Sequence, residues 1–108
     1  MNYMGIGLLY KNSQVDYDDK ETVLDLIKEM DNHPGWLLKF ASKRLRDDKE
    51  VVLAAVGKDY WVLQSASKRI RDDKEVVLAA VSNNGSDLQY ASKRLQDDKE
   101  VVLAAVSN

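Results

Sequence analysis

Three nearly identical blocks, each starting 25 residues after the one before, constrain this chain more than any other feature. Residues 41–56 read ASKRLRDDKEVVLAAV, residues 66–81 read ASKRIRDDKEVVLAAV, and residues 91–106 read ASKRLQDDKEVVLAAV. A fixed period of this length is typical of proteins that stack small, similar structural units. We therefore expect the copied residues to serve the stack, and residues specific to function to lie where the copies differ.

A weaker copy of the block precedes the three strong ones. The DDKE sequence at 18–21 matches DDKE at 47–50, but at a spacing of 29, and the four additional residues fall within 28–34. We predict a single domain over residues 1–108, built from four units. The units span about residues 5–31, 32–57, 58–82 and 83–108.

Each unit is predicted to contain two short helices. An Asp followed three residues later by Glu is expected to start the second helix, because the Asp accepts from free backbone N–H groups and the Glu reaches back, as in a capping box. These pairs are Asp18/Glu21, Asp47/Glu50, Asp72/Glu75 and Asp97/Glu100. The VVLAAV sequence that follows is apolar all round, which predicts a helix buried on every side.

The first helix of each unit is predicted from an apolar stripe. Leu88, Ala91 and Leu95 lie at positions i, i+3 and i+7, so this helix would lie outside while the second fills the core. The expected architecture is an all-α solenoid of about four helical hairpins with a 25-residue period. The alternative makes VVLAAV a parallel strand in a strand–helix solenoid, because short apolar runs fit both structures. The paired alanines and the capping pattern favour the helix.

Composition favours a soluble folded domain. Apolar residues make up 44% of the chain and charged residues 31%, and the net charge is −2. This balance predicts no general attraction to nucleic acid or to anionic membranes. There is no Cys, which excludes disulfides and thiolate metal sites. The longest apolar run is far shorter than the roughly 20 residues that cross a bilayer, so we expect no membrane span.

No pattern in the sequence predicts catalysis, and we expect a protein that is not an enzyme and has no cofactor and no metal. The Asp pairs are expected to cap helices. His33, the sole histidine, lies in a turn sequence without the partner residues of a zinc site. Residues 83–87, NNGSD, resemble part of a calcium loop but lack its distal Glu.

Aromatic residues are the strongest candidates for binding a protein or peptide partner. Trp and Tyr often anchor interfaces, and in this chain they gather in the variable half of the unit. The predicted partner-binding residues are Trp36, Tyr60, Trp61 and Tyr90. Alternatively, these side chains fill gaps between the layers.

A ladder of basic residues supports an alternative function, the binding of nucleic acid or phosphoinositide. Its members recur once per layer, roughly 10 Å apart. They are Lys43, Arg44, Lys68, Arg69, Lys93 and Arg94. The same residues could instead compensate helix dipoles and pair with nearby acids, so nucleic acid is the less expected partner.

The two ends of the array differ in polarity. Thr22 and Asp25 stand where later units carry Val and Ala, as expected of a first unit that caps the array. The last unit has no such polar replacement. We therefore expect either self-association through the C-terminal unit or a natural protein that continues beyond residue 108.

The sequence DDKEVVLAAVSNNGSDLQYAS, followed by KRLQDDKEVVLAAV, resembles the repeats of the domain of unknown function 4116 family. The resemblance covers residues 35–108. It implies a tandem helical array used as a module in bacterial proteins, among them effectors of intracellular bacteria, and in giant viruses. No activity is established for this family, so no catalytic residue carries over. The expected location is cytoplasmic, or inside a host cell if the chain is part of an effector.

Overall fold

The computed structural model describes residues 16–29, 36–56 and 62–107, which form helices and short turns with no strand among them. The elements are α2 (Lys20–Glu29), α3 (Trp36–Phe40), α4 (Lys43–Arg46), α5 (Lys49–Ala55), α6 (Val62–Ser65), α7 (Lys68–Arg71), α8 (Lys74–Asn83), the 3₁₀ helix η1 (Gly85–Tyr90), α9 (Lys93–Gln96) and α10 (Lys99–Val106). The all-α prediction is confirmed. The strand–helix alternative is wrong, because the three copies of VVLAAV form α5, α8 and α10, and only Val56, the C-cap of α5, lies outside its helix.

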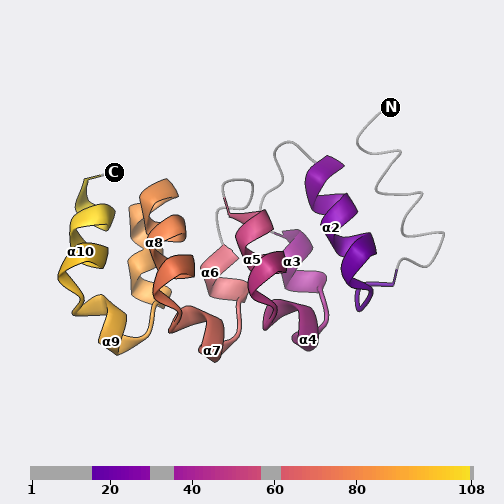
Figure 1. Ribbon diagram of the computed structural model, residues 1–108, viewed down its shortest axis with the longest axis horizontal. Coiled ribbons are helices and arrows are strands. Elements are labelled where there is room, and N and C mark those ends of the chain that lie inside the picture. The colour runs from indigo at the N-terminus through magenta and orange to yellow at the C-terminus, as the bar shows by residue number, and fades with distance from the viewer. Residues whose placement is uncertain (1–15, 30–35, 57–61, 108) are drawn as a thin grey trace.

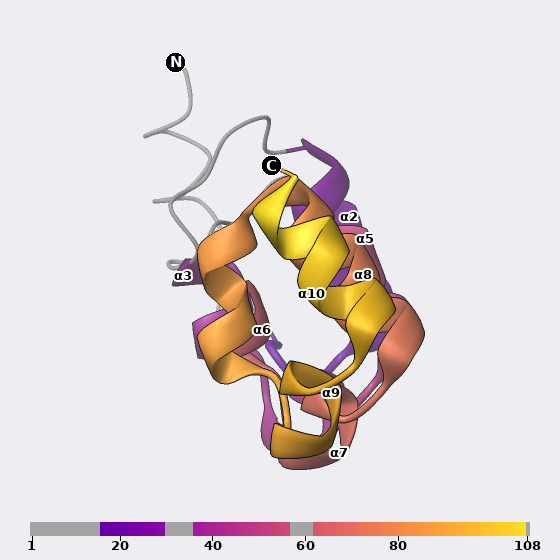
Figure 2. The same cartoon turned by 90° about the vertical axis from the view of Figure 1, so that its left-hand side faces the viewer.

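The helices form two rows. The longer helices α2, α5, α8 and α10 lie side by side in one row, and each contacts the next (Figure 1). A second row contains α3, α6 and η1, which also contact one another in chain order. The short helices α4, α7 and α9 join the rows along one edge (Figure 2). None of the helices in the described residues is long and apolar enough to cross a membrane.

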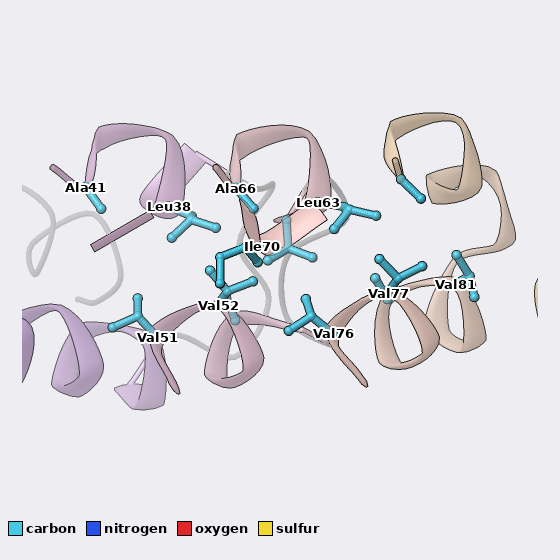
Figure 3. Packing of buried hydrophobic residues seen from close by; sticks show 14 of the residues in the cluster. Leu38, Ala41, Val51, Val52, Leu63, Ala66, Ile70, Val76, Val77 and Val81 are labelled. Carbon is cyan, nitrogen blue, oxygen red and sulfur yellow. The ribbon is translucent and has the colours of Figure 1, made fainter. Parts of the chain in front are cut away.

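The apolar core lies between the two rows. Leu38 and Leu63 point into it from α3 and α6, and Val52 and Val77 face them from α5 and α8 (Figure 3). Ile70 of α7 closes the core from the joining edge. The expectation that VVLAAV helices are buried on every side is wrong, because these helices form one wall of the core. Their outer residues are only partly buried, as the leucines of α5 and α8 show.

Each complete unit contains three helical segments, so the prediction of two helices per unit is wrong. The predicted first helix is broken at the Ala-Ser pair that begins every block. Ser67 has extended backbone angles, φ −68° and ψ 164°, and its hydroxyl accepts from the backbone N–H of Ile70 at 3.2 Å. The serine is therefore the N-cap of a new short helix. The same break occurs at Ser42 and Ser92.

The second Asp of DDKE caps the longer helix, whereas the sequence pattern pointed to the first. Asp48 has extended backbone angles, and its carboxylate accepts from the backbone N–H of Val51 at 3.2 Å. Asp73 and Asp98 do the same for α8 and α10. The first Asp ends the preceding short helix, so its carboxylate is free to contact a different layer.

We predict that Gly85→Ala destabilises the protein. Gly85 begins η1, and a Cβ atom there would overlap the backbone carbonyl oxygen of Ala105 in α10. A helix backbone cannot move aside as a flexible side chain can, so η1 and α10 must separate at a cost of roughly 1–3 kcal/mol. Thermal unfolding followed by circular dichroism measures the fall in Tm. Ser82→Ala, at an exposed position of α8, is the control. An unchanged Tm for Gly85→Ala would contradict this packing.

Candidate functional site

Adjacent layers are joined first by a backbone hydrogen bond. We define a layer as a helix of the second row together with the short helix and the longer helix that follow it, which gives the layers α3–α4–α5, α6–α7–α8 and η1–α9–α10; α2 precedes them. The backbone N–H of Ser67 donates to the carbonyl of Arg46 in the preceding layer at 3.0 Å, and Ser92 donates to Arg71 at 3.0 Å. Ser42 makes the equivalent bond to Tyr17, which precedes α2. The break at each serine therefore frees an N–H group that ties two layers together.

The first Asp of DDKE accepts from the layer that follows. The Asp47 carboxylate accepts from the Ser67 hydroxyl at 2.5 Å and from the Arg69 Nε at 2.9 Å. The guanidinium of Arg69 also donates to the backbone carbonyl of Asp47. The same set of bonds joins Asp72 to Ser92 and Arg94, and Asp18 to Ser42 and Arg44.

These contacts stabilise the charged form of the first Asp. The hydrogen bond from Ser67, and next the one from Arg69, lower the pKa of Asp47 below its ordinary value of 3.8, against a smaller opposing effect of desolvation. The pKa of Asp72 is lowered for the same reasons by Ser92 and Arg94. The layer contact is therefore strongest where these carboxylates are ionised.

The Lys of DDKE forms a second bridge to the next layer. The Nζ atom of Lys49 lies 3.2 Å from the Asp73 carboxylate and 2.7 Å from that of Glu75. These two contacts, that with Glu75 first, raise the pKa of Lys49. Lys20 reaches Asp48 and Glu50 in the same way, and Lys74 reaches Asp98 and Glu100.

The capping Asp serves two contacts at once. Desolvation raises the pKa of Asp73, but the backbone bond from Val76 and the contact with Lys49 outweigh it and lower the pKa. Asp73 therefore caps α8 and accepts the lysine of the preceding layer. Glu75 binds that same lysine, so it does not return to the N-cap as a capping box requires.

Every residue of DDKE thus has a structural contact wherever two described layers meet. The acidic pairs therefore have a structural role in the contacts between layers. Among the described residues, no group of three or more His, Cys, Asp or Glu side chains is arranged to hold a metal ion. His33 lies outside the described residues.

These contacts engage the arginines of the predicted basic ladder but not its lysines. Its arginines form ion pairs with the first Asp of the preceding layer, at Nε to carboxylate distances of 2.9–3.0 Å. Its lysines, Lys43, Lys68 and Lys93, are exposed. Within the described part of the chain they form no ion pair. The ladder as a surface for phosphate stays a prediction, in which the lysines contribute the free charge.

The predicted aromatic strip is only partly described. Tyr90 is half-buried at the end of η1, and Trp36 begins α3. Tyr60 and Trp61 lie outside the described residues. Phe40, which also lies in the variable half of the unit, has a side chain that is 58% exposed, and its ring centroid lies 6.4 Å from that of Tyr17. The strip as a binding surface stays a prediction.

Two equivalent pockets lie between successive layers, and the sequence analysis did not identify them. The first, of about 260 Å³, is lined by Lys43, Arg46, Ser65, Ala66 and Ser67. The second, of about 310 Å³, is lined by Lys68, Arg71, Tyr90, Ala91, Ser92 and Lys93. The sequence pattern that corresponds to the pockets is an Arg repeated at a spacing of 25, Arg46 and Arg71, with Gln96 at the equivalent position of the third block.

Comparison with known families agrees with the repeat pattern. A family model described as a domain of unknown function (DUF4116) matches residues 19–71 and 73–108. This chain belongs to the DUF4116 family. The match begins at residue 19, so it includes α2, which lies before the start of the resemblance seen in the sequence. No curated protein and no solved structure matches the chain significantly.

We predict that Asp72→Ala lowers Tm at neutral pH, whereas Asp97→Ala leaves it nearly unchanged. Both residues end a short helix, but only Asp72 accepts from a following layer. Since the pKa of Asp72 is lowered in the folded state, its stabilisation is full above the ordinary value of 3.8. It is lost as the pH falls through the folded-state pKa.

Thermal unfolding of the two variants from neutral to acidic pH measures this difference. The gap in Tm between them should close in acid. Equal losses for both variants at neutral pH would show that the carboxylate acts within its own layer.

Proposed function

We propose that this chain is a non-catalytic helical-repeat scaffold, an α-solenoid, that binds a protein or peptide. The observation that carries the proposal is the separation of copied and variable residues into different parts of the structure. The copied block supplies the short helices and the longer row, including all the contacts between layers described above. The variable segments supply α3, α6 and η1, which lie next to one another in the second row (Figure 2).

This division suits a scaffold. In stacked repeats each unit contacts only its neighbours, and curvature and extension create long surfaces on which partners bind. Here the second row reads WLLKF in α3, VLQS in α6 and GSDLQY in η1. A partner lying along that row meets a different set of side chains at every layer. Specificity therefore arises without any change in the contacts that hold the stack together.

The non-catalytic part of the proposal rests on the use of the acidic residues. Catalysis by paired carboxylates needs groups whose pKa values are separated and which face a reacting atom. The described pairs instead face serine, arginine and lysine side chains of neighbouring layers. The candidate acids therefore already have a use in the fold.

A peptide selected against the full chain tests the scaffold proposal. We expect peptides that bind to the second row, so Tyr90→Ala and Trp36→Ala should weaken their affinity while leaving Tm unchanged. Isothermal titration calorimetry measures the Kd, and thermal unfolding provides the control. Lys28→Ala, at an exposed position of α2, should leave the Kd unchanged. Loss of stability of about 3 kcal/mol or more with binding unaltered would identify the aromatics as core residues.

Salt dependence separates the alternative function from the favoured one. Nucleic acid or phosphoinositide binding through the exposed ladder lysines would weaken steeply as salt rises, because counterions are released from phosphates. Binding to apolar and aromatic groups would change little. The arginine ion pairs across the layers reduce the free positive charge that this alternative can use.

We also propose that the C-terminal layer associates with another layer. Leu103 and Val106 of α10 are 54% and 70% exposed. Among the described residues, Asp97 and Lys99 contact no following layer, although their equivalents in the other layers do. The outer face of α10 therefore presents apolar side chains together with one acid and one base at the positions used for stacking.

We predict that an added layer stabilises the chain. A copy of residues 84–108 fused after Asn108 continues the 25-residue register, because Ser107-Asn108 matches Ser82-Asn83. Tm should rise, because Leu103 and Val106 become buried. Lys99→Met should lower Tm in the extended protein and have little effect in the original one. Sedimentation of both chains over a range of concentrations tests self-association. A strictly monomeric original chain whose Tm ignores the added layer would contradict the proposal.

A further inference from the structure

The repeated block contains cations that the contacts between layers do not use. Ser, Arg and DDKE of each block are engaged across the layers, as described above. Two positions remain: the Lys that follows each Ser, and the Arg before DDKE. That Arg is Arg46 in the first block and Arg71 in the second. Both sit at the wall between two described layers, in the pockets of about 260 and 310 Å³.

The guanidinium groups of Arg46 and Arg71 lack partners. The Nε atom of each is buried and has no hydrogen-bond partner. Neither side chain forms an ion pair within the described residues. A buried N–H group without a partner is unfavourable, and a guanidinium presents several donors in a planar fork that matches a carboxylate or phosphate. Each pocket is therefore lined by a guanidinium group that has no ion pair among the described residues.

Each pocket adds a lysine to its arginine. Lys43 lines the first pocket beside Arg46, and Lys68 lines the second beside Arg71. The second pocket has a further lysine, Lys93. The other lining residues are small or aromatic: Ser65, Ala66 and Ser67 in the first pocket, and Tyr90, Ala91 and Ser92 in the second. A volume near 300 Å³ is at the lower limit of ligand pockets. It suits the end of one side chain better than a whole cofactor.

The third block supports a specific role for the arginine. Gln96 replaces it, and among the described residues no layer follows to complete a third pocket. The Gln96 amide donates to the carbonyls of Gln89 and Ala91, both at 3.1 Å. An uncharged residue thus satisfies this position within its own layer. Among the described residues, the arginine thus occurs in the two blocks that line a pocket.

We infer that the two pockets bind acidic side chains of an extended peptide, with Arg46 and Arg71 each receiving one carboxylate. This inference rests on the proposed scaffold function and names the chemistry of its partner. Equivalent points of packed helical layers lie roughly 10 Å apart. A peptide in the extended polyproline II conformation advances about 3.1 Å per residue with three residues per turn, so two acids on the same face stand three residues apart. The small and aromatic walls accommodate the methylene groups of a glutamate, which a phosphate group lacks.

Matched peptides and the full chain test this inference. The probe is a ten-residue peptide with two glutamates three positions apart, and the controls carry adjacent glutamates or two glutamines. Arg71→Gln should raise the Kd of the probe about tenfold, the loss expected for a charged hydrogen-bond partner. Arg46→Gln should do the same. Neither variant should have a lower Tm, because Gln occupies this position in the third block, where its amide is hydrogen-bonded.

A variant with the net charge restored distinguishes binding in the pocket from general electrostatic attraction. Arg71→Gln combined with Gln96→Arg keeps the net charge but moves the cation to a layer without a described pocket. The probe should stay weakly bound to this double variant. Recovery of the affinity would overturn the inference, since charge alone would explain the binding. The Arg Nε–H signals of Arg46 and Arg71 should shift in ¹⁵N spectra on addition of the probe.

Other outcomes also decide the question. Equal affinity for the adjacent-glutamate control would overturn the inferred spacing. Tighter binding of a single-stranded oligonucleotide, lost in Arg71→Gln, would make nucleic acid the occupant and overturn the peptide. If selected peptides bind the second row but ignore Arg46 and Arg71, this inference fails while the scaffold proposal stands. If neither selected nor acidic peptides bind, both fail.

Discussion

The rest of the structure depends on the hydrogen bonds that the first Asp of DDKE accepts from the Ser and Arg of the following layer. Asp47 ends one short helix while its carboxylate holds Ser67 and Arg69, which begin the next. The same serine caps its own helix and donates its N–H to the carbonyl of Arg46. Helix start, helix end and layer contact are therefore one local arrangement.

This coupling explains why such short helices are stable. Helices of four to ten residues are marginal alone in water, and α4, α7 and α9 have only four residues each. Their ends are fixed from outside by the adjacent layers and their leucine or isoleucine is fully buried. Exposed ion pairs contribute little singly. Here they act together with backbone bonds and a continuous core, so stability is a property of the stack.

The sequence predicted the helical class and the repeat, because apolar periodicity and the DDKE signal are local. Asp47 and Asp48 are both acceptable N-caps by residue type, but Asp47 ends the preceding short helix, which leaves the capping role to Asp48. The same holds for Asp97 and Asp98. The sequence did not predict the features that depend on contacts with adjacent layers. The break at Ser67 was missed because Ala, Lys and Arg favour helix, and the bond that stabilises the break comes from another layer. Arg69 could not be distinguished from Lys68 until the layers were in place.

The residues of the copied block differ in whether contacts between layers explain their presence. Asp97 and Lys99 occupy positions that bond to a following layer in the other blocks. Among the described residues they contact no following layer, yet the third block keeps them. Arg46 and Arg71 show the opposite behaviour: they leave a buried nitrogen without a partner, and the third copy replaces them with Gln96, which is satisfied. Stability alone would favour glutamine in all three layers. The acidic ligand inferred above would give these two arginines a role that stability does not explain.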